Sequence, residues 1–343
     1  MASEAKAVHE VLPNVVPLWE VFSTLIPSGP GKMVEPFVWN GKELLKELKR
    51  IAYDVKLGGE VERRVLVPVN PGLKKLGLYT ATHTIYVGFQ IVLPGEVAGA
   101  HRHTPFASRF MIKGEAWTTV DGVEISFREG DFITTPRWAW HDHVNRSSEP
   151  AIWMDALDTP IPKFLLASTF QDYGEEVQPL MTGDLYTRSV STGLTPAFSL
   201  DWTKAASPPL KFAWNDTYGM LKDLASISDG SPYEGVTVMM KDPSTGRDVS
   251  GSLGADMTLL KSGTRTKSHR HTMSVVYYVV KGRGTITVEG KTLPWGESDI
   301  IALTPWAYHE LANEGPGEAV LFSINDRPLL TSVGVYREEP ENK

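Results

Sequence analysis

The sequence contains a second copy of part of itself, displaced by 168 residues. The tetrapeptide His-Arg-His-Thr begins at His101 and again at His269. The same offset relates further features, which are Lys113-Gly114 and Lys281-Gly282, Gly122 and Gly290, Asp131 and Asp299, His141 and His309, and Asn145 and Asn313. One tetrapeptide could recur by chance, but a single gapless offset across all these features indicates two homologous domains. A chain of 343 residues has room for two domains of ordinary size.

Each copy has the composition of β-structure. In the first copy, residues 84–93 are rich in β-branched and aromatic side chains, and residues 116–120 lead into an Asp121-Gly122 turn. In the second copy, residues 274–280 and 284–288 have the same character. Short strands between such turns are typical of small antiparallel barrels or jelly rolls. We therefore expect a mainly β protein with two tandem jelly-roll barrels.

The segments outside the repeats complete the expected organisation. Residues 40–55 carry leucine and isoleucine at helical spacing, with Asn40 as a candidate N-cap. Residues between the copies have a mixed composition with glycine and proline, which suggests a structured linker. The expected parts are an N-terminal extension with a helix (1–60), a first barrel (61–165), a linker (166–228) and a second barrel (229–338).

Composition excludes several classes of protein. The net charge of −7 argues against a nucleic-acid-binding protein, which would usually be basic. No apolar run approaches the roughly 18 residues that a membrane helix needs. Residues 1–20 carry acids, a histidine and prolines in place of a signal-peptide core. We therefore expect a cytoplasmic protein without nucleic-acid or membrane partners. The chain has no cysteine, so a metal ion must be held by imidazole or oxygen.

Most of the nine histidines lie in the two repeats, at positions 101, 103, 141 and 143 in the first and at positions 269, 271 and 309 in the second. Side chains alternate along a strand, so His101 and His103 project from one face, roughly 6–7 Å apart. A third imidazole from a neighbouring strand could complete a metal site. A lone histidine is usually structural, but a paired His-x-His with a distant histidine, present twice, favours metal binding.

The first copy resembles the cupin pattern Gly-x5-Pro-x4-His-x3-Asn. Gly130, Pro136, His141 and Asn145 match this pattern after His101-x-His103, so the resemblance makes His141 the third ligand, ahead of His143. Many cupins also carry a glutamate three or four residues after the His-x-His. Residues 104–108 and 272–276 contain none. This departure weakens any similarity to oxalate decarboxylases, oxalate oxidases and flavonol dioxygenases.

A two-cupin chain with three-histidine sites and no such glutamate resembles the gentisate 1,2-dioxygenase family, with its salicylate and 1-hydroxy-2-naphthoate relatives. The resemblance covers roughly residues 15–330 and rests on Pro17 to Glu20, Glu62 to Leu66, Asn70 to Gly72, His101 to Thr104, Arg109-Phe110, Trp140 to His143 and Trp153 to Pro160. It implies Fe(2+) at His101, His103 and His141, a small aromatic acid and O2 as reactants, and a homotetramer. It also implies that gentisate opens to maleylpyruvate. By the same resemblance, Arg63-Arg64, Gln90, Tyr86 and Asp155 line the pocket.

Two residues of the first copy are expected to act on the substrate. Three neutral imidazoles leave coordination positions free for an acidic substrate and dioxygen. Arg109 lies six positions after His103, an even number along a strand, so its guanidinium can face the same interior and bind a carboxylate. Pro105 lies between them, and a surface ion pair is the alternative role for Arg109. His143 could deprotonate the phenol or protonate the peroxide, or it could be a structural residue.

The second copy lacks both of these residues. Tyr277 stands at the position of Arg109, and Leu311 stands at the position of His143. We therefore expect catalysis in the first domain. In the second domain, His269, His271 and His309 either bind a metal ion without turnover or are structural.

Three alternatives remain open from the sequence. The closest is cleavage of salicylate or 1-hydroxy-2-naphthoate, which lack the second, para hydroxyl of gentisate. A zinc site is another, because three histidines and a water molecule also suit catalytic zinc. The last is a bicupin without catalytic activity, which the clustered histidines argue against.

Overall fold

The computed structural model describes residues 11–57, 61–180 and 210–341. The chain divides into two units, residues 1–32 and residues 33–343, which are described separately. The described part of the first unit contains one helix, α1 (Leu18–Leu25), in which no residue is buried. No helix in the described residues is long and apolar enough to cross a membrane.

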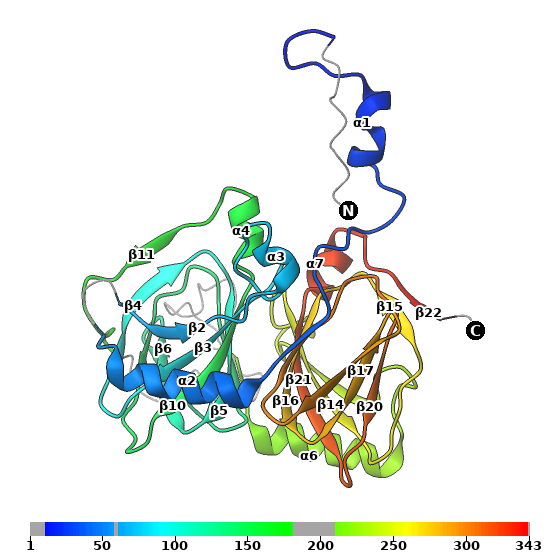
Figure 1. Cartoon of the computed structure of the whole chain (residues 1–343). Coiled ribbons are helices and arrows are strands. Elements are labelled where there is room, and N and C mark those ends of the chain that lie inside the picture. Colours follow the sequence, from blue (N-terminus) through cyan, green and yellow to red (C-terminus); the bar gives the residue numbers. More distant parts are fainter. Residues whose placement is uncertain (1–10, 58–60, 181–209, 342–343) are drawn as a thin grey trace. The chain divides into compact units, whose positions relative to one another are not determined.

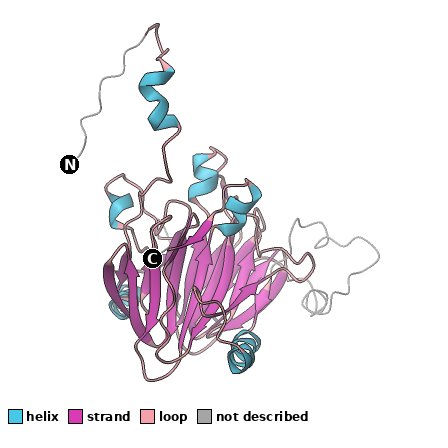
Figure 2. Ribbon diagram, turned by 90° about the vertical axis from the view of Figure 1, so that its right-hand side faces the viewer, coloured by secondary structure: helices cyan, strands magenta, loops and turns pink. Residues whose placement is uncertain are grey.

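The second unit contains the two expected barrels, each built from two antiparallel sheets (Figures 1 and 2). The first barrel has a six-stranded sheet in the order β12 (Lys211–Phe212), β8 (Phe132–Thr135), β5 (Ala107–Lys113), β10 (Ala151–Leu157), β3 (Tyr86–Val92) and β2 (Arg64–Leu66). Its five-stranded sheet runs β11 (Phe170–Asp172), β4 (Val97–His103), β9 (His141–Val144), β6 (Glu115–Val120) and β7 (Val123–Arg128).

The second barrel repeats this plan. Its six-stranded sheet runs β1 (Phe37–Trp39), β19 (Ile300–Ala302), β16 (Val275–Lys281), β21 (Ala319–Asn325), β14 (Gly254–Leu260) and β13 (Val236–Met240). Its five-stranded sheet runs β18 (Lys291–Gly296), β17 (Arg283–Val288), β20 (His309–Asn313), β15 (His269–His271) and β22 (Glu338–Pro340). The prediction of a mainly β protein with two tandem jelly-roll barrels is confirmed.

Within the described residues, five helices accompany the barrels, namely α2 (Gly41–Asp54), α3 (Pro71–Lys74), α4 (Pro160–Phe164), α6 (Trp214–Ile227) and α7 (Arg327–Ser332). The helix expected in residues 40–55 is confirmed as α2, where the Asn40 side chain accepts a hydrogen bond from the Glu43 amide at 3.1 Å. Helix α2 packs on β2 and β3 of the first barrel, and α6 packs on β13 and β14 of the second barrel (Figure 1).

The two barrels exchange strands. β1, which precedes the first barrel in the sequence, pairs with β19 of the second barrel, and β12, which precedes the second barrel, pairs with β8 of the first. Just after each exchanged strand, the first amide of a helix donates to a duplicated aspartate. Gly41 N donates to Asp299 Oδ1 at 3.0 Å, and Trp214 N donates to Asp131 Oδ1 at 2.9 Å. We keep 61–165 and 229–338 as the proposed limits of the barrels, with these strands added from outside.

Strand alternation divides the six-stranded sheets into an outer and an inner face. On β3, Val87, Phe89 and Ile91 belong to a core that includes residues from both barrels. Phe110 and Phe322 stack across this core with their ring centroids 4.4 Å apart. The six-stranded sheets therefore pack back to back. Alternate residues of the same strands face into each barrel, which is where the candidate site lies.

Candidate active site

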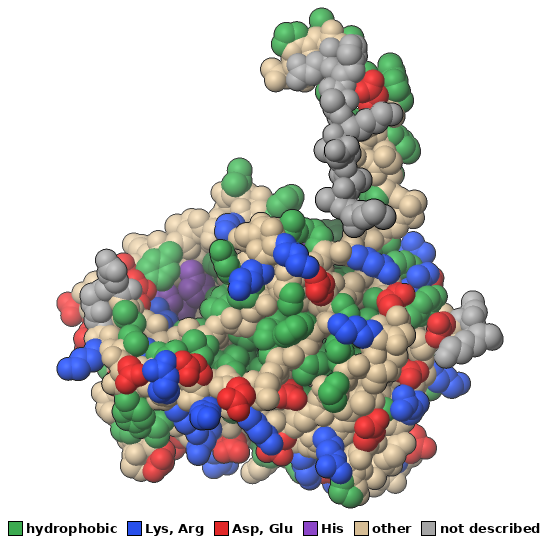
Figure 3. Space-filling view, in the orientation of Figure 1, with side chains coloured by type: hydrophobic (Ala, Val, Ile, Leu, Met, Phe, Trp, Pro, Cys, Tyr) green, Lys and Arg blue, Asp and Glu red, His purple; other side chains and the backbone are tan. Residues whose placement is uncertain are grey.

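Three histidines converge in the first barrel, as the sequence predicted. His101 and His103 lie on β4, and His141 lies opposite His101 at the start of β9. The ring centroids of His101 and His141 are 4.1 Å apart, and those of His103 and His141 are 4.8 Å apart. One ligand nitrogen from each ring lies within 4.8 Å of the others. Histidine side chains are visible in a hollow of the face shown in Figure 3.

The rings are held by backbone carbonyls. The Nδ1 atom of His101 lies 3.0 Å from Gly99 O, that of His103 lies 2.9 Å from Pro105 O, and that of His141 lies 2.9 Å from Ala139 O. A carbonyl at Nδ1 favours the tautomer in which Nε2 has a free lone pair. His141 Nε2 is buried and has no hydrogen-bond partner. Such an orphaned atom costs about 1–3 kcal/mol, which a bound metal ion would offset.

The cluster is neutral at physiological pH. Burial lowers the pKa of His103 to about 4 and that of His101 to about 2, with the neighbouring Arg63 adding to the effect on His101. Burial also lowers the pKa of His141 well below its ordinary value. Neutral imidazoles are the form that binds metal. The donor set, its protonation and the unpaired nitrogen therefore fit a divalent metal ion.

Arg109 is fixed inside the same barrel. It faces Asp155 across β5 and β10, with Nε 3.1 Å from Asp155 Oδ1, and its Nη1 donates to Thr135 Oγ1 at 2.6 Å. The Nε–H is not aligned with the carboxylate, so this contact is an ion pair and not a hydrogen bond. Burial lowers the pKa of Arg109 to about 10, so the guanidinium stays charged at neutral pH. Its charge lowers the pKa of His101 and His103, which places it within electrostatic reach of the cluster.

The wall beside Arg109 comes from β3. Gln90 pairs with Trp153, Gly88 with Asp155 and Tyr86 with Leu157, so the strand is regular and Tyr86 and Gln90 share the inner face. A Cβ on Gly88 would lie 2.6 Å from Val65 Cγ1 and 2.7 Å from the Tyr86 hydroxyl oxygen. A side chain at Gly88 would therefore require Val65 and Tyr86 to move.

His143 lies beside the cluster without joining it. Among the described residues, the candidate metal group in this barrel contains only His101, His103 and His141. The His143 ring is buried, its centroid is 5.7 Å from that of His141, and its Nδ1 lies 2.8 Å from Thr118 Oγ1. Burial lowers the pKa of His143 well below its ordinary value, so the ring is neutral.

Comparisons with known proteins agree with this geometry. Residues 88–157 and 256–325 match the family model described as Cupin domain. Gentisate 1,2 dioxygenase 1 of Aquipseudomonas alcaligenes is 34% identical over 328 residues, which are 95% of this chain and 92% of that protein. 1-Hydroxy-2-naphthoate 1,2-dioxygenase of Nocardioides sp. is 35% identical over 321 residues, which are 92% of this chain and 81% of the relative. The chain belongs to the gentisate 1,2-dioxygenase family.

The similarity extends to a solved structure. The crystal structure of salicylate 1,2-dioxygenase from Pseudoaminobacter salicylatoxidans, described as adducts with gentisate, has a TM-score of 0.86 at 29% identity, covering 96% of this chain and 92% of that one. The family resemblance inferred from the histidine motifs is therefore confirmed, and the protein is a ring-cleaving dioxygenase with two cupin domains. The clustered histidines point to a metal cofactor.

In this dioxygenase, Arg63 and not Arg64 reaches the histidines. Arg64 donates to Ala52 O at 2.5 Å, at the end of α2, and forms an ion pair with Glu96. Arg64 pairs with Ile91, whose side chain lies in the core between the barrels, so it belongs to the outer face. Arg63 Nη2 lies 2.6 Å from His101 Nδ1 and donates a hydrogen bond to the Gly99 carbonyl at 3.1 Å. Arg63 directly precedes β2, and because side chains alternate in extended backbone, Arg63 faces inward where Arg64 faces outward.

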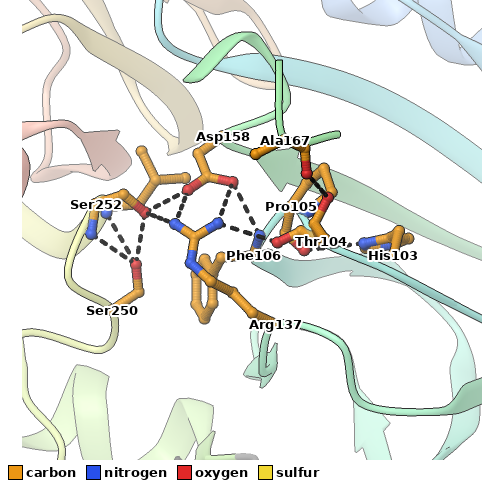
Figure 4. A network of polar contacts seen from close by, with 10 residues as sticks. His103, Thr104, Pro105, Phe106, Arg137, Asp158, Ala167, Ser250 and Ser252 are labelled. Atoms are coloured by element: carbon orange, nitrogen blue, oxygen red, sulfur yellow. Dashed lines mark hydrogen bonds and ion pairs between the residues drawn. The ribbon is translucent and has the colours of Figure 1, made fainter. Parts of the chain in front are cut away.

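A polar network that the sequence did not reveal fixes the loop after His103 (Figure 4). The buried Asp158 accepts a hydrogen bond from Phe106 N at 2.9 Å and pairs with Arg137. Arg137 also donates to Thr104 O at 3.1 Å and to Ser252 Oγ of the second barrel at 2.7 Å. The loop carries the Pro105 carbonyl that holds His103, so the network positions a candidate metal ligand.

The second barrel also brings its three histidines together. His269, His271 and His309 form a group with a fourth residue, Glu234, which the sequence analysis missed. Glu234 precedes β13 and lies far from the histidine motifs in the sequence, so no local pattern pointed to it. Tyr277 and Leu311 are buried in an apolar core in this barrel.

Proposed function

We propose that this dioxygenase is Fe(II)-dependent and opens gentisate between the carboxyl-bearing and hydroxyl-bearing carbons to give maleylpyruvate. The observation that carries the proposal is the three-histidine cluster, which includes no carboxylate among the described residues and has Arg63 and Arg109 within electrostatic reach. Neutral imidazoles do not compensate the charge of a divalent ion. An acidic substrate would therefore complete the charge balance of the site.

We assign the metal to His101, His103 and His141. When bound, iron supplies open coordination positions and the redox chemistry of ring opening. Arg109 binds the substrate carboxylate, because a guanidinium matches a carboxylate with parallel hydrogen bonds. Asp155 lies against its Nε and Thr135 accepts a hydrogen bond from its Nη1, so we assign the substrate carboxylate to its Nη2.

We assign proton transfer to His143. The Thr118 hydroxyl orients its ring through Nδ1, and the neutral imidazole can accept the phenolic proton at Nε2. Tyr86 and Gln90 line the inner wall, and Asp155 acts by positioning Arg109. Of the Arg63-Arg64 pair that the resemblance placed in the pocket, we assign to Arg63 the second positive charge near the substrate.

Salicylate or 1-hydroxy-2-naphthoate is the second candidate substrate. The observation that favours it is the similarity to relatives named for these acids. Family membership further suggests a cytoplasmic homotetramer that works without nucleic-acid or membrane partners. Analytical ultracentrifugation checks the tetramer.

The test is oxygen uptake by Fe(II)-loaded protein, prepared anaerobically, with gentisate, salicylate and 1-hydroxy-2-naphthoate. We expect uptake equimolar with gentisate and appearance of the ring-opened product. Preference for either other acid would replace gentisate with that substrate. Equal activity of zinc-loaded protein would contradict the iron assignment.

A matched pair of variants locates the reaction. We expect His101→Ala to abolish oxygen uptake, because it removes a ligand from the first cluster, whereas His269→Ala alters only the second cluster. Activity that survives in His101→Ala and disappears in His269→Ala would reverse the assignment of the domains.

A further inference from the structure

We propose that the second barrel holds a divalent first-row transition-metal ion in a site formed by His269, His271, His309 and Glu234, and that this site does not accept an aromatic acid. The inference concerns a separate cluster and does not rest on the proposed reaction of the first barrel.

The geometry is that of a preformed ligand set. The centroid of the His309 ring is 4.4 Å from that of His269 and 4.8 Å from that of His271. Glu234 Oε1 lies 2.9 Å from His269 Nε2. One ligand atom from each of the four residues lies within 4.8 Å of the others. Three imidazoles and one carboxylate suit metals such as iron, manganese, nickel or zinc.

The histidines are buried with nitrogens that nothing else satisfies. His271 Nδ1 lies 3.1 Å from Met273 O and His309 Nδ1 lies 3.0 Å from Ala307 O, which repeats the carbonyl anchoring of the first barrel. His271 Nε2, His309 Nε2 and His269 Nδ1 are buried and have no hydrogen-bond partner. A purely structural role would leave these three polar atoms unpaired, whereas a metal ion would bind two or more of them.

The charge beside the first histidine of each motif differs between the barrels. In the first barrel the neighbour is a cation, because Arg63 Nη2 lies 2.6 Å from His101. In the second barrel the neighbour is an anion, because Glu234 Oε1 lies 2.9 Å from His269. A carboxylate at this place favours a bound cation and compensates its charge. The second site therefore has less need of an acidic ligand from solution.

The inner wall of the second barrel also lacks a receptor for an acid. Tyr277 occupies the position of Arg109, and the buried Asp256 lies at the position of Gly88. Asp256 Oδ1 lies 3.3 Å from Arg327 Nη2, so this arginine is already paired with a protein carboxylate. Leu311, in the place of His143, offers no proton-transfer group. A substrate carboxylate entering here would meet Asp256 and Glu234.

A bound ion would join three segments of the second barrel. His269 and His271 lie on β15, His309 begins β20, and Glu234 lies in the turn that leads into β13. β15 also pairs with the C-terminal strand β22. Because the ligands come from distant parts of the sequence, metal binding would stabilise the folded barrel.

The test uses the full chain with the first site removed by His101→Ala and His141→Ala. Anaerobic titration with Co2+ should show one ion bound per chain, with visible absorption bands, and a raised melting temperature. Gentisate and salicylate should leave the spectrum unchanged. Absence of binding would overturn the site, and a spectral shift with either acid would overturn its exclusion.

A matched pair of glutamate variants tests the ligand set in the same background. Glu234→Gln should weaken Co2+ binding at least tenfold, whereas Glu314→Gln, an exposed glutamate of the same barrel that hydrogen-bonds to Thr285, should not. An equal effect of the two changes would remove Glu234 from the site. If the background variant fails to fold, metal analysis compares the unmodified protein with His269→Ala. A loss of one ion per chain in the variant supports the proposal, and equal metal content overturns it.

Discussion

At the scale of single residues, the first barrel owes its proposed chemistry to buried groups that constrain one another. Arg109 keeps its charge inside the protein because Asp155 lies against one edge of the guanidinium and Thr135 against another. His143 keeps its orientation because Thr118 contacts its Nδ1. Each residue proposed to contact the substrate is therefore held by a neighbour that does not itself react. Variants of Arg109 should change substrate binding, whereas variants of His143 should change the rate of the reaction.

We expect Arg109→Ala to raise KM for the aromatic acid by roughly 30- to 150-fold, because it removes a charge-assisted contact of about 2–3 kcal/mol. Steady-state oxygen uptake checks this. Metal content should be unchanged. Arg109→Lys is the matched control and should recover part of the loss, because it keeps the charge beside Asp155 but not the paired hydrogen bonds. An unchanged KM in Arg109→Ala would remove this residue from the pocket.

His143→Gln should lower kcat by about 10²- to 10⁴-fold, the range typical of a lost general base, while iron content stays at the unmodified level. Thr118→Val tests the positioning role, and we expect a smaller loss of kcat because the imidazole remains. Parallel metal analysis and oxygen uptake provide the measurement. Loss of iron in His143→Gln would instead assign this residue to the metal site.

At the scale of elements, each barrel binds a strand and the start of a helix that belong to a different part of the sequence. The second barrel binds the segment before the first barrel, and the first barrel binds the segment before the second. Asp131 is the clearest example. Its Oδ1 accepts from Trp214 N at the start of α6, and its Oδ2 accepts from Arg128 N at 3.1 Å and lies 3.1 Å from Lys211 Nζ. One buried carboxylate thus holds a turn of the first barrel and the segment that enters α6.

We expect Asp131→Ala to lower the free energy of unfolding by about 2–3 kcal/mol, because it leaves buried donors unpaired at a helix N-terminus. Asp131→Asn should cost less, since an amide oxygen can still accept one hydrogen bond. Urea denaturation followed by circular dichroism measures both. Equal stability of Asp131→Ala and the unmodified protein would show that α6 and β12 are held without this residue.

At the scale of the whole molecule, the two barrels share one core. Phe110 and Phe132 of the first barrel pack on Phe322 of the second, with ring centroids 4.4 Å and 5.3 Å from it. Two equivalent polar contacts cross between the barrels. Ser252 of the second barrel contacts Asp158 of the first, and at the positions related by the 168-residue offset Thr84 Oγ1 donates to Asp326 at 2.6 Å. The barrels should therefore unfold together.

Phe322→Ala should lower the free energy of unfolding by about 3–5 kcal/mol, the usual cost of removing a buried aromatic ring. Differential scanning calorimetry should still show one transition. Tyr53→Ala, at a side chain that is 72% exposed, is the control and should change stability little. Two separate transitions in the unmodified protein would contradict a shared core.

The repeat and the histidine spacing were sufficient to predict two barrels and the members of each cluster. The offset between His101 and His269 gave the number of domains, and the cupin spacing to His141 identified the third histidine. The resemblance also named Tyr86 and Gln90, which the regular pairing of β3 places on one face. Such inferences succeed because alternation and short turns are local properties, readable from neighbouring residues.

The choice of Arg63 over Arg64, the contribution of Glu234 and the strand exchange were decided only by the tertiary structure. Arg63 and Arg64 are chemically equal, and the pairing of β2 with β3 determines which one points inward. Glu234 reaches His269 across 35 residues of sequence, and β1 crosses to the other barrel. The sequence by itself determined which elements form and which histidines can bind metal. The relative placement of distant segments required the packed barrels, because charge and orientation at a site depend on partners that no local pattern encodes.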